Sequence, residues 1–108
     1  MALKVEIVSR SEAKWSGEAA QVSVPSVEGE VGILPGRQPL LAILGTGDIR
    51  VTQVDGEVLS IPVMGGFCSM DHDVVTVAAD YAGDEVAAQN ARLARRTGLA
   101  GTAAMTEG

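Results

Sequence analysis

The sequence contains few of the side chains on which most protein chemistry depends. Its 108 residues include one cysteine, Cys68, one histidine, His72, and three aromatic residues, which are Trp15, Phe67 and Tyr81. A single cysteine excludes an internal disulfide and is compatible with a reducing compartment. Because aromatic residues are scarce, Val, Ile, Leu and Ala must fill the core. A hydrophobic fraction of 46% nevertheless argues against a disordered chain.

Basic residues and long apolar runs are also scarce. The formal net charge of −6 disfavours binding to nucleic acid phosphates or to anionic lipid. No stretch approaches the roughly 20 apolar residues of a membrane-spanning helix. The N-terminal MALKVEIVSR carries a lysine at its fourth position and does not have the pattern of a signal peptide. The length predicts one domain with its own core, and any membrane contact is expected to run through a partner.

Short strand patterns follow one another over the first 80 residues. Alternating or β-branched runs predict eight strands, at 3–8, 21–24, 31–34, 40–44, 48–54, 57–64, 67–70 and 74–79. Asp55-Gly56 predicts a hairpin turn, and Asp71-His72-Asp73 predicts a polar turn between strands. Leu40–Leu44 is apolar throughout, which predicts a strand buried on both faces. Short strands separated by turns at intervals of about ten residues are typical of a β-sandwich or a barrel.

After residue 80 the pattern becomes helical. Asp84 is expected to cap a helix that carries Glu85 in its first turn and runs over Val86–Arg96. Gly98 is expected to end this helix. The remaining residues, LAGTAAMTEG, are small and polar and are expected to fray.

The one concentration of basic residues in the sequence lies on this helix, at Arg92, Arg95 and Arg96. Arg92 and Arg96 share a helical face, with Arg95 beside them. The more common interpretation is a solvated face whose positive charge suits the C-terminal end of a helix. The alternative is docking of these arginines to an acidic partner surface.

No constellation of residues predicts catalysis, a metal site or a cofactor. His72 lies between two aspartates, but without a second histidine or a cysteine cluster a solvated turn is favoured over a metal or acid–base site. Cys68 is interpreted as a small buried hydrophobic residue, since pairing with His72 would require an accident of strand register. The glycine-rich segments lack the Gly-Lys-Ser/Thr ending and the following helix of a phosphate-binding loop.

Four motifs, taken in order along residues 3–80, resemble the epsilon subunits of F-type ATP synthases. The most specific is Glu28-Gly-Glu-Val-Gly-Ile-Leu-Pro-Gly36, followed by Pro39-Leu-Leu41. The others are Trp15-Ser-Gly-Glu18 after a first strand, Gly65-Gly-Phe67 opening a strand, and Val75-Thr-Val-Ala-Ala-Asp80 as the last strand before the helix. No other family known to us fits this order.

The resemblance implies a mostly β chain: an N-terminal β-sandwich of two sheets over residues 1–82, and a short helical C-terminal region with a frayed tail over residues 83–108. It implies a non-catalytic subunit of the central stalk, bound to the gamma subunit and resting on the ring of c subunits. The stalk rotates as protons cross the membrane and so couples proton transport to ATP synthesis. The implied location is the cytoplasmic face of the cell membrane, as a peripheral part of the complex.

The resemblance also assigns positions to partners. Glu28, Gly29 and Glu30 match the loop that faces the c ring. The gamma-facing segment runs from Ile33 to Leu41, and the residues matched to it are Ile33, Leu34, Pro35, Arg37, Pro39, Leu40 and Leu41. Arg37 departs from the family pattern, in which a histidine usually follows Pro-Gly. An arginine adds a permanent charge, and we expect it to pair with an acid on gamma.

The C-terminal region departs further from the family pattern. In many members two helices form a hairpin that extends along gamma and restrains ATP hydrolysis, which takes about forty residues. Only 28 residues follow Asp80, so we expect one helix, in a region that is either naturally short or truncated. This departure argues against inhibition by an extended hairpin and against nucleotide binding by that region. Contact of the arginines with the catalytic head is still possible.

Two other function classes fit the sequence less well. A ligand-binding β-sandwich or barrel would need a pocket lined by aromatic residues, and the chain has three aromatic residues. A small enzyme is less favoured still, because the sequence offers no nucleophile–base pair and no metal-ligand set.

Overall fold

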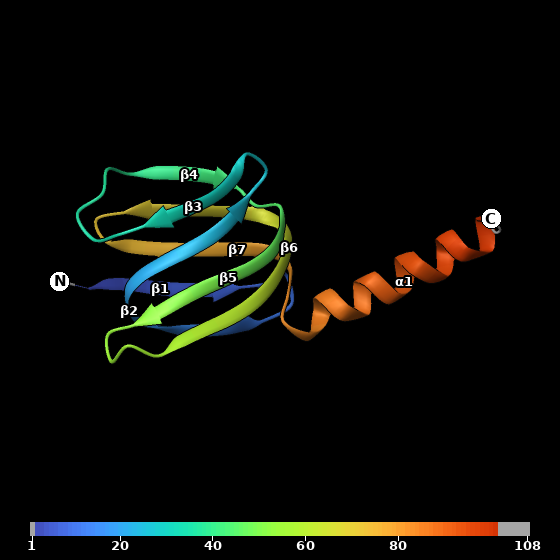
Figure 1. The fold of residues 1–108 in the computed structure, drawn as a ribbon, viewed down its shortest axis with the longest axis horizontal. Helices are drawn as coiled ribbons and strands as arrows, with labels where there is room; N and C mark the ends of the chain where they lie inside the picture. Colours follow the sequence, from blue (N-terminus) through green and yellow to red (C-terminus); the bar gives the residue numbers. More distant parts are fainter. Residues whose placement is uncertain (1, 102–108) are drawn as a thin grey trace.

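The computed structural model describes the backbone of residues 2–101 and the side chains of residues 2–93. Within these residues, seven strands are followed by one helix (Figure 1). Their bounds are β1 Leu3–Val8, β2 Ala13–Ser26, β3 Gly29–Ile33, β4 Leu40–Ile43, β5 Thr46–Gln53, β6 Val58–Asp71, β7 Val74–Ala82 and α1 Asp84–Gly101.

The strands form the two-layered β-sandwich that the resemblance implies. One layer contains the first part of β2, then β1, β7, the second part of β6, and β4. The other contains β3, the second part of β2, β5, and the first part of β6. All pairings are antiparallel except that of β1 with β7. The long strands β2 and β6 belong to both layers, so hydrogen bonding continues from one layer into the other (Figure 1).

The bend in β6 requires the two glycines at its centre. Gly65 and Gly66 have φ angles of 75° and 107°, which side chains of L-amino acids rarely adopt. A Cβ atom on Gly66 would lie 2.2 Å from the carbonyl oxygen of Ala78 on β7. Residues 57–64 and 67–70 were predicted as two strands, which is wrong because the backbone bends at these glycines without leaving the ladder with β7.

The core lies between the two layers and is almost entirely aliphatic. The inward positions of β1 are Leu3, Val5 and Ile7, and each is at most 3% exposed. Cys68 is also buried, as the sequence predicted, and Trp15 is partly buried and packs against this core. The remaining buried members are Ala19, Val22, Val24, Ile33, Leu44, Ile49, Val51, Val63, Met70, Val75, Val77, Ala79 and Ala82. Val, Ile, Leu and Ala therefore supply most of the core, which confirms the expectation from composition.

The strand at Leu40–Leu44 is not buried on both faces, and that prediction is wrong. Leu41 and Ile43 are 69% and 56% exposed, whereas Leu40 and Ala42 are half-buried. The structural reason is that, among the described residues, no second layer covers the outer face of β4, on which Leu41 and Ile43 lie. An apolar run at Leu40–Leu44 thus need not mean a strand buried on both faces, because one face of this strand is an exposed apolar surface.

The helix α1 projects from one end of the sandwich (Figure 1). Asp84 is already the first helical residue, so the prediction that it caps the helix from outside is wrong. The carboxylate of Glu85 instead accepts the N–H of Ala82, the last residue of β7. The helix also continues past Gly98 to Gly101, because one glycine costs a helix only about 1 kcal/mol. Part of the tail predicted to fray is thus helical, and residues 102–108 lie outside the described residues. Among the described residues, no helix combines the length and apolarity needed to cross a bilayer.

Candidate partner-binding surface

The described residues contain no arrangement suited to covalent or metal chemistry. His72 lies in the exposed turn between β6 and β7, where its Nδ1 is 2.8 Å from Asp71 Oδ1. Burial raises the pKa of the Cys68 thiol to about 11, so the thiolate that a nucleophile requires is disfavoured. Over residues 2–93, no three His, Cys, Asp or Glu side chains gather closely enough to hold a metal ion.

The glycine- and proline-rich segment singled out in the sequence folds around β3. Glu28 lies in the turn that joins β2 to β3, and Leu34–Pro39 form the loop that joins β3 to β4. A five-residue strand spans about 15 Å, so the turn and the loop lie at opposite ends of β3 (Figure 1). One continuous motif therefore supplies two separate surfaces.

The turn between β2 and β3 is tight and carries acidic side chains. Gly29 adopts a φ of 122°. Ser26 Oγ donates to the carbonyl oxygen of Gly29 at 2.5 Å and accepts the N–H of Glu28 at 3.2 Å. Glu30 accepts a hydrogen bond from Ser23 Oγ at 2.5 Å and lies 3.7 Å from Arg50. Glu28 makes no side-chain contact of this kind among the described residues and is exposed.

Large apolar side chains are exposed beside this turn and along β4. We call Val27, Leu41, Ile43 and Phe67 the apolar edge; they are between 47% and 69% exposed. Ile43 and Phe67 are directly paired across β4 and β6, and the N–H of Val27 donates to the carbonyl oxygen of Ile43. Single exposed aliphatic residues are unremarkable, but a contiguous group of them is typical of an interaction site.

A groove of about 260 Å³ lies between the β2–β3 turn and β4. It is lined by Ser26, Val27, Glu28, Val31, Arg37, Leu40, Leu41, Ala42 and Ile43. Of the residues matched to the gamma-facing segment, Leu34 and Leu41 are strongly exposed, whereas Ile33 is fully buried. Ile33 thus belongs to the core, and its side chain cannot contact a partner without unfolding the strand.

The loop between β3 and β4 is fixed at two points. The backbone N–H of Gly36 donates to Asp73 Oδ1 in the β6–β7 turn at 2.8 Å. Arg37 Nη1 donates to the carbonyl oxygen of Gly32 on β3 at 2.5 Å. Among the described residues, Arg37 forms no ion pair with a carboxylate. Its charge is therefore available to a partner.

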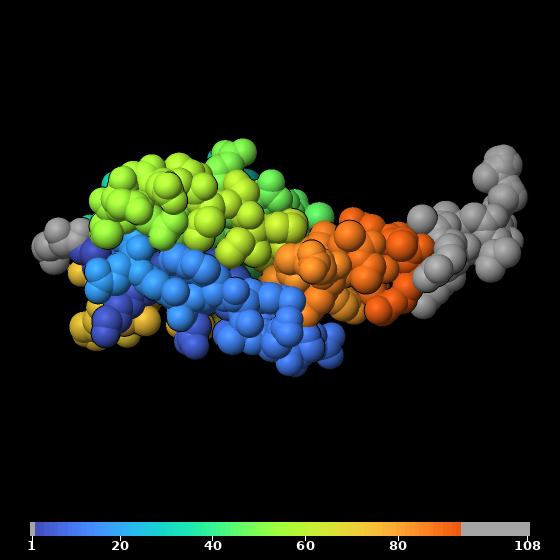
Figure 2. Space-filling model, turned by 90° about the horizontal axis from the view of Figure 1, so that it is seen from below, coloured from blue at the N-terminus to red at the C-terminus, as the bar shows by residue number. Residues whose placement is uncertain are grey.

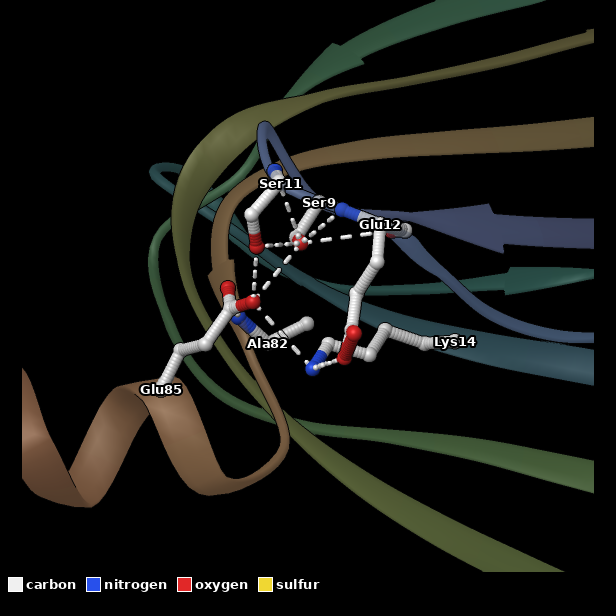
Figure 3. Close-up of polar contacts among 6 residues, drawn as sticks. All are labelled: Ser9, Ser11, Glu12, Lys14, Ala82 and Glu85. Carbon is white, nitrogen blue, oxygen red and sulfur yellow. Dashed lines mark hydrogen bonds and ion pairs between the residues drawn. The ribbon is translucent and has the colours of Figure 1, made fainter.

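A second polar cluster fixes the base of α1 (Figure 3). The carboxylate of Glu85 accepts hydrogen bonds from Ser11 Oγ, from Ser9 Oγ at 3.0 Å and from the N–H of Ala82 at 3.3 Å. Its Oε2 also lies 3.2 Å from the ammonium group of Lys14. One carboxylate thus joins the β1–β2 segment to the start of the helix, and Figure 2 shows these two parts side by side.

These contacts favour the charged form of Glu85. The hydrogen bond from Ser11 is the largest cause, with further contributions from Lys14, Ser9 and the backbone of Ala82, and they lower the pKa of Glu85 from 4.5 to about 2. The pKa of Lys14 is raised in turn, chiefly by its hydrogen bond to Glu12. We call Ser9, Ser11, Lys14 and Glu85 the helix clamp.

Arg92 is exposed and donates to Gln89 Oε1 at 3.3 Å, one turn earlier on α1. Together with Arg10 and Tyr81 it lines a hollow of about 340 Å³ at the helix base, which also contains Asp80 and Glu85. The side chains of Arg95 and Arg96 lie outside those that the structure describes. All three arginines precede the last turn of the helix, which carries no basic residue. The expectation that their positive charge lies at the C-terminal end of the helix is therefore wrong.

Two features of these surfaces were not found from the sequence. The helix clamp joins Glu85 to residues 71 or more positions earlier in the chain, and a serine pair followed by a lysine gives no signal for such a contact. The exposure of the apolar edge depends on which faces of β4 and β6 are covered by the other layer, and a run of apolar residues does not reveal that. The sequence placed Glu85 in the first helical turn, but it gave no indication of which residues Glu85 contacts.

Comparison with protein families matches residues 2–84 to the family described as ATP synthase, Delta/Epsilon chain, beta-sandwich domain. The ATP synthase epsilon chain of Micrococcus luteus is 50% identical over 88 residues, which cover 80% of this chain and 97% of that protein. The ATP synthase epsilon chain of Corynebacterium diphtheriae is 45% identical over 87 residues, which cover 78% of this chain and 71% of that protein.

Solved structures share the fold at low sequence identity. A chain of the Euglena gracilis mitochondrial ATP synthase matches 75% of this chain with a TM-score of 0.71 and 22% identity. A chain of the Tetrahymena thermophila mitochondrial ATP synthase central stalk and c ring matches 76% of it with a TM-score of 0.60 and 10% identity. The matches span 52% and 66% of those two chains, so each is a longer protein that shares the β-sandwich.

Proposed function

Because the chain belongs to the delta/epsilon family of ATP synthase subunits, we propose that it links the gamma subunit to the c ring in the central stalk. In this role it is a non-catalytic rotor subunit of the F1 sector. It transmits rotation, and thereby couples proton transport to ATP synthesis, without taking part in covalent chemistry.

The observation that carries the proposal is the apolar edge, which extends along β4 from the β2–β3 turn. Val27, Leu41, Ile43 and Phe67 leave apolar surface in water, and burying it against a partner is favourable by about 25 cal/mol per Å². Arg37, at the rim of the same groove, supplies a charge that can fix the orientation of that partner. We assign Leu41, Ile43 and Phe67 of this edge, together with Leu34, Pro35 and Pro39 of the loop, to gamma.

The β2–β3 turn is assigned to the c ring. It lies at the other end of β3 from the loop (Figure 1), so both partners can be contacted at once. The exposed carboxylate of Glu28 and the tightly bonded backbone at Gly29 present a small, rigid, acidic tip, with Glu30 held in place by Ser23. Contact with the ring would place the subunit at the cytoplasmic face of the membrane, peripheral to it.

A closely packed sandwich suits such a part of a rotor. The aliphatic core is fully buried, and interiors packed in this way deform little. The turn assigned to the c ring and the loop assigned to gamma are joined directly by β3. A displacement at one surface is therefore passed to the other through a strand and not through a flexible linker.

The test is titration calorimetry of the chain with its own purified gamma subunit. We expect tight one-to-one binding that falls by about tenfold or more in Leu41→Asn, as for an apolar anchor of an interface. The matched control is Val54→Asn, because Val54 is similarly exposed at 62% but lies in the β5–β6 turn. Circular dichroism establishes that both variants fold. A folded wild-type chain that does not bind gamma would overturn the proposal.

A further inference from the structure

The outer edge of β3 presents backbone groups that no strand among the described residues pairs. Val31 and Ile33 are opposite Val24 and Val22 of β2. The carbonyl oxygen of Pro25 accepts the N–H of Gly45 on the far side of β2, so Pro25 points away from β3. Along a strand, the N–H and C=O groups of successive residues point to alternate sides. The backbone groups of Val31 and Ile33 therefore bond to β2, whereas those of Glu30 and Gly32 point outward.

Arg37 gives independent evidence for this direction. Its guanidinium donates to the carbonyl oxygen of Gly32, which is possible only if that oxygen is on the open side of β3. A side chain therefore supplies the donor that a neighbouring strand would otherwise supply. Capping an edge with a charged side chain is a common way of preventing unwanted strand pairing.

The edge of β4 faces the same groove. The N–H of Val27 donates to the carbonyl oxygen of Ile43, and the N–H of Gly45 donates to that of Pro25. These two bonds join the β2–β3 turn to the end of β4. Toward Leu41 and Arg37 no ladder joins β3 to β4 in the described part of the chain, and the two strands diverge (Figure 1). The groove is thus closed at one end and open at the other.

We propose that the gamma subunit binds by inserting an extended segment as an added strand along the open edge of β3, displacing Arg37 from Gly32. The inference rests on the proposed function and specifies how the partner is held. The backbone of the added segment would bond to Glu30 and Gly32, and its apolar side chains would cover Val31 and Leu41. The released Arg37 then becomes available to a carboxylate on the same segment.

An extended segment fits this surface better than a helix does. The unpaired groups alternate along β3 as strand pairing requires, whereas a helix satisfies its own backbone and would leave them unbonded. Apolar surface accompanies them on the groove wall, at Val31, Leu40 and Leu41. An added strand would pair the outward backbone groups of β3 and would bury the apolar wall of the groove at the same time.

The experiment compares Gly32→Pro with Gly32→Ala in calorimetric titrations with purified gamma. Proline removes the outward N–H without removing a bond to β2, and edge strands tolerate it. Alanine keeps the N–H, and its Cβ would meet no atom within 4 Å. We expect Gly32→Pro to bind about tenfold or more weakly, as for a lost backbone hydrogen bond at an interface, while Gly32→Ala binds within about threefold of the wild type. Equal binding by a folded Gly32→Pro chain would overturn the inference.

A second measurement does not depend on the variant. Amide hydrogen exchange of the wild-type chain is followed with and without saturating gamma. The N–H groups of Glu30 and Gly32 are expected to exchange at least about tenfold more slowly in the complex. Unchanged exchange at both residues in a complex that does form would overturn strand addition and leave the proposed function standing. Absence of any complex would instead overturn the proposed function.

Discussion

Replacing Gly66 by alanine should strongly destabilise the sandwich, because the added methyl group would meet the backbone of β7. Gly66 has a φ of 107°. A Cβ atom on it would lie 2.2 Å from the Ala78 carbonyl oxygen, 2.7 Å from the Ala79 Cα and 2.9 Å from the Asp80 nitrogen. All three atoms are backbone of β7, which is held in register on Gly66 and Phe67. The clash therefore cannot be relieved by turning a side chain.

The magnitude follows from two contributions. Holding a residue with a Cβ at positive φ costs about 1–2 kcal/mol, and inserting a methyl group into a packed site costs about 1–3 kcal/mol. The free energy of unfolding should therefore fall by about 2–5 kcal/mol. For a domain of this size that is a decrease of at least about 8 °C in the midpoint of thermal unfolding.

The assay is urea and thermal unfolding followed by far-ultraviolet circular dichroism. Gly32→Ala serves as the matched control, because Gly32 has no positive φ and open space around its Cβ position; its free energy of unfolding should change by less than about 0.5 kcal/mol. A change of less than about 1 kcal/mol for Gly66→Ala would refute the reasoning, since it would mean that β6 can bend without these angles.

Three further predictions concern the helix base and the core. Because the folded state lowers the pKa of Glu85 from 4.5 to about 2, its charged form stabilises the fold above pH 4.5 and this contribution is lost as the pH falls toward 2. The urea midpoint of the wild type should exceed that of Glu85→Gln at neutral pH and converge with it near pH 2, and a constant difference would contradict this. Cys68, fully buried with its pKa raised to about 11, should react with Ellman's reagent at least about a hundredfold more slowly in the native chain than in urea; comparable rates would show that the core opens readily. Arg92→Gln should leave the thermal midpoint within about 2 °C, since the side chain is exposed. It should also change the rate of ATP hydrolysis by the reconstituted complex if Arg92, with Arg95 and Arg96, docks to an acidic surface of the catalytic head, and an unchanged rate would contradict that docking.

The sequence predicted the fold best where local chemistry decides the structure. Asp55-Gly56 and Asp71-His72-Asp73 do form the turns that were predicted from their residue types. The motif around Gly29–Gly36 identified the family through its resemblance to the epsilon subunits, and its glycines and prolines predicted the turns on either side of β3. At Gly65-Gly66 the same reasoning failed: the glycines permit a bend, but whether the ladder continues through it depends on β7.

The candidate surfaces were predicted less well, since exposure and contact depend on distant parts of the chain. Ile33 and Leu34 are adjacent in sequence, yet one is fully buried and the other is 56% exposed. The exposed Leu41 was expected to be buried, because its apolar neighbours gave no sign that only one face of β4 is covered. The bonds from Ser9 and Ser11 to Glu85 could not be predicted, because they follow from the meeting of the chain's first turn with its helix.

The pairing of β1 with β7 also determines when the sandwich can form. Lys4 is opposite Val74, and the intervening chain supplies every other strand. Hairpins such as β5–β6 close over a few residues and can form early, whereas a parallel pair separated by this much sequence must first close a long loop. During synthesis, β1 can find β2 at once, but its other edge stays open until residues 74–82 have left the ribosome. Closure of the sandwich is therefore expected to be a late step that follows completion of nearly the whole β region.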